Sequence, residues 1–153
     1  EIYDPIENIH EDQILKHSKI PADINEKILT QSKLWAMQLA EELQYIGTLC
    51  VEFFIDKNEN LYVNEIAPRV HNSGHLTINA YNVSQFENHI RAVCDLQQIP
   101  LKKTSDAKMI NLIGDQITVY RNKKFQPNEF FIDYLKKEIK DKRKMGHLTT
   151  LLK

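Results

Sequence analysis

Two short β-rich segments joined by a polar turn constrain the fold of this chain most. Residues 47–55 read GTLCVEFFI, residues 60–65 read NLYVNE, and the intervening DKNEN at 56–60 is polar. This pattern predicts an antiparallel hairpin. In such a hairpin, Glu52 and Glu65 lie side by side on neighbouring strands and point the same way.

Two carboxylates that close repel each other unless one is protonated or a cation lies between them. Oxygen-only ligation favours Mg²⁺, which usually takes one or two carboxylates together with substrate phosphates. Glu52 and Glu65 therefore predict a metal site. The alternative for each glutamate taken alone is a solvent-exposed charge on an edge or at the end of a strand.

The second strand continues into a run of costly polar groups, NEIAPRVHNSGH at 64–75. So many polar side chains in a row would be costly to bury in a packed core, so the run predicts a site for anions and a metal. Arg69 suits a planar oxyanion because its guanidinium presents a fork of donors. His71 and His75, four residues apart, leave zinc open as an alternative. Zinc needs a helix here and further ligands, whereas the Ser-Gly pair at 73–74 favours a loop.

Together with Glu52, the run resembles the ATP-grasp domain of 5-(carboxyamino)imidazole ribonucleotide synthetase, an ATP-dependent enzyme family of bacterial and fungal purine biosynthesis. Further similar motifs are YDPIENIH at 3–10, MINLIG at 109–114 and RKMGHL at 143–148. A generic ATP-grasp ligase shares the two carboxylates and the asparagine. The PRVHNSGH continuation and the late RKMGH are much more specific to this family.

The resemblance implies that Glu52 and Glu65 hold Mg²⁺, with Mn²⁺ as an alternative ion, against the phosphates of ATP. It places Asn64, Glu65 and His10 at the nucleotide. The task of such ligands is to neutralise charge during phosphoryl transfer. For His10 the alternative is an ordinary turn histidine.

The resemblance also implies that Arg69, His71 and Asn72 are the catalytic residues, lining a pocket for bicarbonate and carboxyphosphate that includes Ser73. Donors of this kind hold a small oxyanion while water is kept away.

The resemblance further implies that Lys137 and Arg143, the arginine of the RKMGHL motif, bind the substrate's ribose phosphate. For both Lys137 and Arg143, the alternative to phosphate binding is a solvated basic run over 136–144. The family often has a proline-glycine pair where this chain has Asp141 and Lys142, which leaves the shape of the phosphate loop open. The implied reaction has two steps. ATP phosphorylates bicarbonate, and the amine of 5-aminoimidazole ribonucleotide then takes up the carboxyl group in a closed site.

The resemblance implies an α+β fold, with an ATP-grasp core of antiparallel sheet and flanking helices over 1–100 and a small β-rich C-terminal subdomain over 101–153. Apolar spacing predicts helices over about 23–44, capped by Asp23 or Asn25, and over 84–96, capped by Ser84. Strand candidates follow at 108–113, 117–120, 130–135 and 145–151. Trp35 is expected in the core.

The chain has four scattered glycines and no phosphate-cradling glycine-rich loop. We therefore expect a part of a longer protein that lacks much of the adenine clamp and is doubtfully active alone. The rival functions are another ATP-grasp carboxylate-amine or carboxylate-thiol ligase and a non-catalytic nucleotide-binding remnant. Family members are commonly dimers, so a homodimer is expected.

The formal net charge of −1 over 153 residues gives no general attraction for nucleic acid or acidic membranes. No apolar run approaches the roughly 20 residues of a membrane helix, and no secretory leader is visible. The cytoplasm is the expected location. Cys50 and Cys94 lack the spacing of a metal or redox pair and are expected to be buried, reduced thiols.

Overall fold

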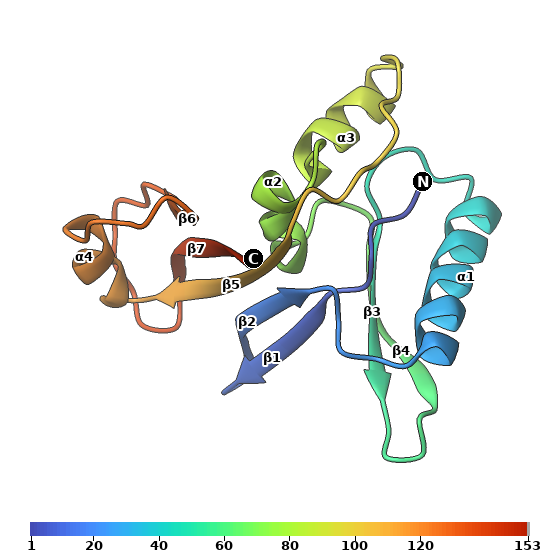
Figure 1. Cartoon of the computed structure of the whole chain (residues 1–153), viewed down its shortest axis with the longest axis horizontal. Helices are drawn as coiled ribbons and strands as arrows, with labels where there is room; N and C mark the ends of the chain where they lie inside the picture. The colour runs from blue at the N-terminus through green and yellow to red at the C-terminus, as the bar shows by residue number, and fades with distance from the viewer. Residues whose placement is uncertain (153) are drawn as a thin grey trace.

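The computed structural model describes residues 1–152 as two antiparallel sheets with helices around them (Figure 1). The predicted C-terminal segment ends at Lys153, which lies outside the described residues. The strands are β1 Glu7–Glu11, β2 Ile14–Ile20, β3 Cys50–Ile55, β4 Leu61–Ala67, β5 Asp106–Ile113, β6 Glu129–Asp133 and β7 Lys144–Leu152. The α-helices are α1 Glu26–Glu42, α2 Thr77–Ala80, α3 Gln85–Val93 and α4 Gln116–Arg121, and a 3-10 helix, η1, covers Asn72–Leu76.

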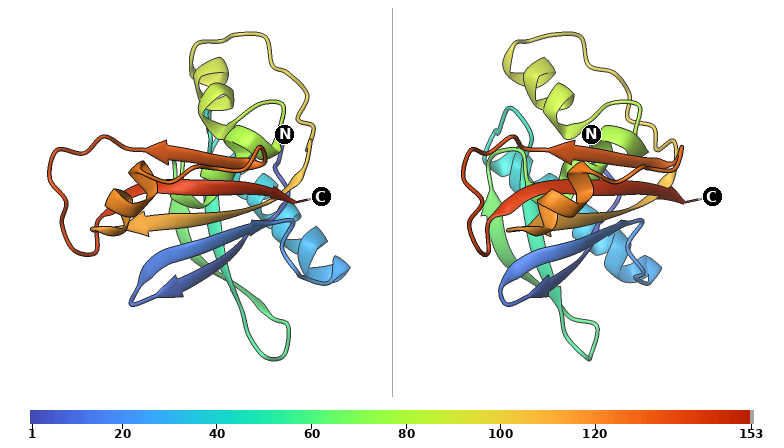
Figure 2. Two further views of the ribbon diagram at one scale, coloured as in Figure 1. Left: turned by 60° about the vertical axis from the view of Figure 1, so that its left-hand side comes forward. Right: turned by 90° about the vertical axis from the view of Figure 1, so that its left-hand side faces the viewer.

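The larger sheet joins the two ends of the described chain. Its strand order is β1-β2-β5-β7-β6, so strands from before residue 21 pair with strands from after residue 105. Both views of Figure 2 show β1 and β2 continuing the layer formed by β5, β7 and β6. The sheet therefore crosses the boundary predicted near residue 100. The division of the chain into domains at 1–100 and 101–153 therefore stays a prediction.

Two hydrophobic clusters lie on this sheet. The larger one packs the sheet against η1 and α2, and its buried members are Ile20, Leu76, Ala80, Tyr81, Ala107 and Met109. The smaller one packs the sheet against α4 through Leu112, Ile117 and Met145. Because neighbouring residues of a strand point to opposite faces, Met109 and Leu112 belong to opposite faces of β5. The sheet is thus covered on both sides.

The predicted hairpin and first helix are confirmed. β3 and β4 pair around residues 56–60, and α1 lies along this hairpin (Figure 1). The Asn25 side chain caps α1 by accepting a hydrogen bond from the backbone N–H of Ile28 at 2.9 Å. Trp35 is half-buried, with its ring centroid 6.3 Å from that of Phe53. It is therefore only partly in the core.

Three expectations from the sequence are wrong in part: the strand at 117–120, the two buried thiols and the loop at 72–76. Residues 117–120, read as a strand, lie in helix α4, because burying Ile117 against the sheet outweighs the strand preference of β-branched residues. The helix predicted over 84–96 is confirmed as α3 with Ser84 as its cap, and its apolar face is exposed, with Ile90 at 54%. Cys94 is exposed and Cys50 half-buried, so they are not two buried thiols. Residues 72–76 form η1 rather than a loop.

Within the described residues, no helix has the length and apolar character needed to cross a membrane.

Candidate active site

The two acidic residues of the hairpin are direct partners. Glu52 on β3 is paired with Glu65 on β4, and the register shifts by one residue immediately after Glu52. This bulge leaves Asn64 as the extra residue of β4. Its Nδ2 atom lies 3.5 Å from Oε2 of Glu52. A bulge re-aims side chains, and here it brings one amide and two carboxylates to one place on the hairpin, as the pattern of residues predicted.

His71 lies beside the carboxylate of Glu52. Its Nδ1 atom is 3.6 Å from Oε1 of Glu52 and 2.8 Å from Oγ of Ser73. Both the His71 and the Glu52 side chains are about 15% exposed. Burial lowers the pKa of His71, and the Glu52 charge only partly opposes this. The imidazole is therefore mainly neutral at neutral pH.

Arg69 and Glu65 form the solvent side of the site. The Arg69 guanidinium lies 3.8 Å from Glu65, and both side chains are more than half exposed. Arg69 also donates to the backbone carbonyl of Val70 at 3.1 Å. An exposed ion pair of this length contributes little to stability. Arg69 is therefore held loosely and can turn toward an anion.

Asn72 faces the five-stranded sheet. Its side chain exchanges two hydrogen bonds with the buried side chain of Asn111 on β5, at 3.1 and 2.7 Å. It also reaches the Tyr134 hydroxyl at 3.4 Å, which in turn lies 2.9 Å from Nδ1 of His147. His147 is buried and carries a pKa lowered to about 4 by that burial and by His75. The structure thus shows Asn72 joining η1 to the sheet, while its role at bicarbonate stays a prediction.

His75 belongs to η1, and its ring packs among side chains of α3 and the five-stranded sheet. Its Nδ1 atom is 2.9 Å from Nε2 of Gln85, and its ring lies near those of Phe86 and His147. Burial lowers its pKa to about 4. Among residues 1–152, no group of three or more His, Cys, Asp or Glu side chains is arranged to hold a metal. The zinc alternative therefore finds no complete ligand set.

Lys144 is a site residue that sequence reasoning did not single out. It is half-buried on β7; burial lowers its pKa, and Glu52 is the main charge that opposes this lowering. Lys144 also contributes to the lowered pKa values of His71 and His75. The charges of Lys144, on the five-stranded sheet, and Glu52, on the hairpin, thus influence each other. The position of Lys144 directly after Arg143 in the RKMGHL motif was the available signal.

Lys137 and Arg143 are both exposed on the segment between β6 and β7. Arg143 donates to the backbone carbonyl of Glu138 at 3.4 Å. The neighbouring Lys136 instead lies over the Tyr134 ring, 5.4 Å from its centroid. The structure therefore places the two predicted phosphate-binding residues on one exposed basic segment, and within the described residues neither forms a hydrogen bond or ion pair with Glu52 or Glu65.

A cavity of about 640 Å³ brings several predicted site residues together. It lies among α1, β3 and the N-terminal segment, and the predicted residues that line it are His10, Glu52, Asn64, His71 and Ser73. The other predicted site residues do not line it: Glu65, Arg69, Asn72, Lys137 and Arg143.

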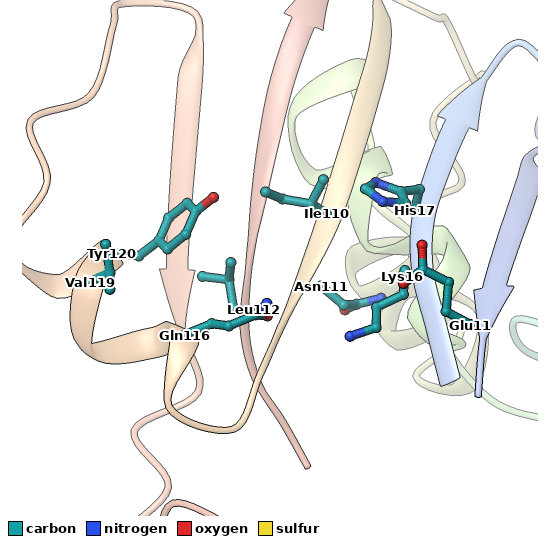
Figure 3. Close-up of a pocket in the computed structure, with 9 residues that line it drawn as sticks. All are labelled: Glu11, Lys16, His17, Ile110, Asn111, Leu112, Gln116, Val119 and Tyr120. Carbon is teal, nitrogen blue, oxygen red and sulfur yellow. The ribbon is translucent and has the colours of Figure 1, made fainter. Parts of the chain in front are cut away.

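A second cleft of about 260 Å³ lies elsewhere on the sheet, lined from β1, β2, β5 and α4 (Figure 3). None of the predicted site residues lines this cleft. Its polar groups include Lys16, His17 and Gln116, which come from opposite sides of the opening. The candidate active site is therefore the larger cavity beside the hairpin.

An acidic hairpin beside an imidazole and an arginine is an arrangement suited to phosphoryl transfer onto a small anion. Residues 1–86 match the ATP-grasp domain family, and residues 107–153 match the phosphoribosylaminoimidazole carboxylase C-terminal domain family. The chain belongs to the ATP-grasp family. Its fold class is α+β, with an ATP-grasp part followed by that C-terminal domain, as its motifs predicted.

Within the family, the chain is similar to N5-carboxyaminoimidazole ribonucleotide synthases, the group that its motifs resemble. The Bacillus subtilis (strain 168) synthase is 45% identical over 148 aligned residues, and the match covers 94% of this chain and 38% of that protein. The crystal structure of the Staphylococcus aureus synthetase complexed with ADP has 42% sequence identity and a TM-score of 0.87, over 98% of this chain and 41% of that one.

A third relative was solved with a second small molecule. The Aspergillus clavatus synthase, in complex with ADP and 5-aminoimidazole ribonucleotide, shares 33% identity with a TM-score of 0.88, over 96% of this chain and 41% of that one. The chain thus spans about 40% of the length of the relatives it matches.

Proposed function

We propose that this chain forms the phosphate, metal and bicarbonate part of an N5-carboxyaminoimidazole ribonucleotide synthase active site. In the reaction, a bicarbonate oxygen attacks the γ-phosphorus of ATP and ADP leaves, giving carboxyphosphate. The exocyclic amine of 5-aminoimidazole ribonucleotide then attacks the carboxyl carbon. Phosphate leaves, and the amine loses one proton. The relatives at 33–45% identity support this assignment.

The pairing of Glu52 with Glu65 across the β3–β4 bulge is the observation that carries the proposal. Together with the side-chain oxygen of Asn64, these residues offer oxygen donors only, which fits Mg²⁺ or Mn²⁺ and not a soft metal. Glu52 and Glu65 are the residues that would hold the ion. When bound, it supplies positive charge that offsets the charge of the ATP phosphates.

Arg69 and His71 are assigned to bicarbonate and carboxyphosphate. Arg69 is free to exchange its long contact with Glu65 for a bidentate pair with a planar oxyanion. Ser73 and Glu52 lie at Nδ1 of His71, which leaves Nε2 available to the anion. Ser73 and Asn72 complete this subsite, Asn72 by fixing η1 on the sheet.

His10 lines the same cavity as Glu52 and Asn64, which supports its assignment to ATP. Lys137 and Arg143 are assigned to the ribose phosphate of 5-aminoimidazole ribonucleotide, because exposed cations on one segment suit a phosphate. We assign residues 1–100 and 101–153 to an ATP-grasp domain and a C-terminal subdomain. We further propose that the protein is a cytoplasmic homodimer.

Substitution of Glu65 in the complete protein that contains this chain tests the function. The unaltered protein should hydrolyse ATP only, or much faster, when bicarbonate and 5-aminoimidazole ribonucleotide are both present. Glu65→Gln should abolish this turnover and leave the circular dichroism spectrum unchanged. The matched control is Glu59→Gln, the same change at an exposed position in the turn of the same hairpin.

Each other outcome has a defined reading. Unchanged turnover in Glu65→Gln contradicts the metal assignment. Turnover with formate in place of bicarbonate would assign the chain to another ATP-grasp ligase. ADP binding without any turnover would assign it to a non-catalytic nucleotide-binding protein.

A further inference from the structure

Gln85 binds the backbone of His71 through both ends of its side-chain amide. Its Oε1 atom accepts a hydrogen bond from the His71 N–H at 2.9 Å, and its Nε2 atom donates to the His71 carbonyl at 2.7 Å. The second hydrogen on Nε2 points to Nδ1 of His75 at 2.9 Å. The side chain is buried, with 3% of the residue exposed. One amide thus uses its acceptor and both donors on the segment that carries His71.

The orientation of this amide follows from its partners. A flipped amide would put two carbonyl oxygens together and two N–H groups together, which costs hydrogen bonds that a buried group cannot replace with water. Since Nε2 can only donate, Nδ1 of His75 is the acceptor and His75 carries its proton on Nε2. The lowered pKa of His75, about 4, agrees with this neutral form.

Gln85 is itself held on two sides. Its backbone N–H donates to the Thr77 hydroxyl at 3.0 Å, and this hydroxyl donates to the carbonyl of Gly74 at 2.6 Å. The backbone carbonyl of Gln85 accepts a hydrogen bond from the hydroxyl of Thr48 at 3.0 Å. Thr48 lies two residues before β3, the strand that carries Glu52. Gln85 therefore ties the start of the Glu52 strand to the His71 segment.

Gly74 leaves the space that this amide occupies. A Cβ atom at position 74 would lie 2.7 Å from Oε1 and 2.9 Å from Cδ of Gln85, closer than real Cβ contacts. Any side chain at this position would push the amide away from His71. The glycine is thus explained by the approach of Gln85.

We propose that Gln85 is a positioning residue for the bicarbonate subsite: it holds the His71 backbone so that the imidazole stays beside Glu52 at the cavity. The inference rests on the function proposed above. Gln85 does not itself reach the reacting atoms, because both ends of its amide are occupied by His71 and His75. A displacement of about 1 Å in a positioned group can cost a large factor in rate.

Gln85→Glu in the complete protein is the decisive variant. A carboxylate cannot donate to the His71 carbonyl or to His75, and it places a charge against that carbonyl. We expect the KM for bicarbonate to rise at least about tenfold while the Kd for ADP stays within about twofold. The control is Gln38→Glu, the same chemical change at an exposed glutamine of α1, which should alter neither constant.

Gly74→Ala is the second variant, because it keeps the amide group of Gln85 and only shifts its position. It should raise the KM for bicarbonate in the same direction and by less. Equal changes in the bicarbonate and ADP constants, or no change in either, overturn the proposal. So does the failure of both variants to fold, since Gln85 would then be required for the structure alone.

The unaltered protein separates this inference from the proposed function. If it shows bicarbonate-dependent turnover and Gln85→Glu behaves like Gln38→Glu, only the role of Gln85 is overturned. If it shows no bicarbonate-dependent turnover, both assignments are overturned.

Discussion

Asn72 and Asn111 exchange a reciprocal pair of amide hydrogen bonds, 3.1 and 2.7 Å long, between η1 and the central strand β5. Asn111 also donates to the carbonyl of Leu15 on β2 at 3.1 Å. One buried side chain therefore joins the predicted bicarbonate segment to two strands that lie far apart in the sequence. The sheet that the C-terminal strands complete is the support of this part of the site.

Replacing Asn111 by Ala should destabilise the protein. The change removes three hydrogen bonds and leaves the Asn72 amide without its main partner, for which we expect a loss of about 1–3 kcal/mol in the free energy of unfolding. Urea unfolding measures the loss, with Asn122→Ala as the control at an exposed asparagine. Equal midpoints for the two variants would show that the network is unimportant for stability.

Arg143→Ala should affect one substrate selectively. If the exposed guanidinium binds the ribose phosphate, the KM for 5-aminoimidazole ribonucleotide should rise by roughly tenfold or more and the KM for ATP should change little. Steady-state kinetics with each substrate varied in turn measures this. Lys142→Ala, the removal of an adjacent exposed cation, is the control. Equal effects of Arg143→Ala on both substrates would exclude the phosphate role.

Gly146→Ala should distort the contact between β6 and β7. A Cβ atom at Gly146 would lie 2.9 Å from Cδ1 of Ile117 and would also contact the Ile132 carbonyl too closely. Because backbone cannot move away cheaply, we expect a loss of about 1–3 kcal/mol in unfolding free energy. A fall in the thermal midpoint checks this. An unchanged midpoint would mean that the strands separate at little cost.

The hairpin and the acidic pair were predictable because they depend on local order in the chain. Alternating β-rich segments around a polar turn fix the register closely enough to pair Glu52 with Glu65. The N-cap at Asn25 was equally local. The residues predicted for the metal and for the anion are close together in the run at 64–75 for the same reason.

Other features depended on contacts that spacing does not encode. The strand preference of residues 117–120 lost to the burial of Ile117 in a helix. An amphipathic stripe predicts that α3 has an apolar face, but not whether residues of this chain cover it. Gln85 and Lys144 reach the site from separate elements, and of the two only Lys144 carried a sequence signal, its place in the RKMGHL motif. Gln85 follows the correctly predicted cap Ser84 as the first residue of α3, but no feature of the sequence indicated the role of its side-chain amide.

Acid should destabilise the protein through the half-buried His75 and the buried His147. Burial lowers the pKa of both His75 and His147 from the ordinary value of 6.5 to about 4, so between these values the unfolded chain binds more protons. The free energy of unfolding must therefore fall as the pH falls through this window. For the shift of His147 the loss is on the order of 3 kcal/mol, at about 1.4 kcal/mol per pKa unit.

His147→Gln isolates this effect. Glutamine does not titrate and can keep a hydrogen bond to the Tyr134 hydroxyl, so the variant should lose part of the acid sensitivity while remaining folded at neutral pH. Urea unfolding of both proteins between about pH 7 and pH 4.5 gives the two slopes. Carboxylates with lowered pKa values, such as Asp133, act below this window and equally in both proteins. Identical slopes would mean that His147 is already protonated, or solvated, in the folded protein.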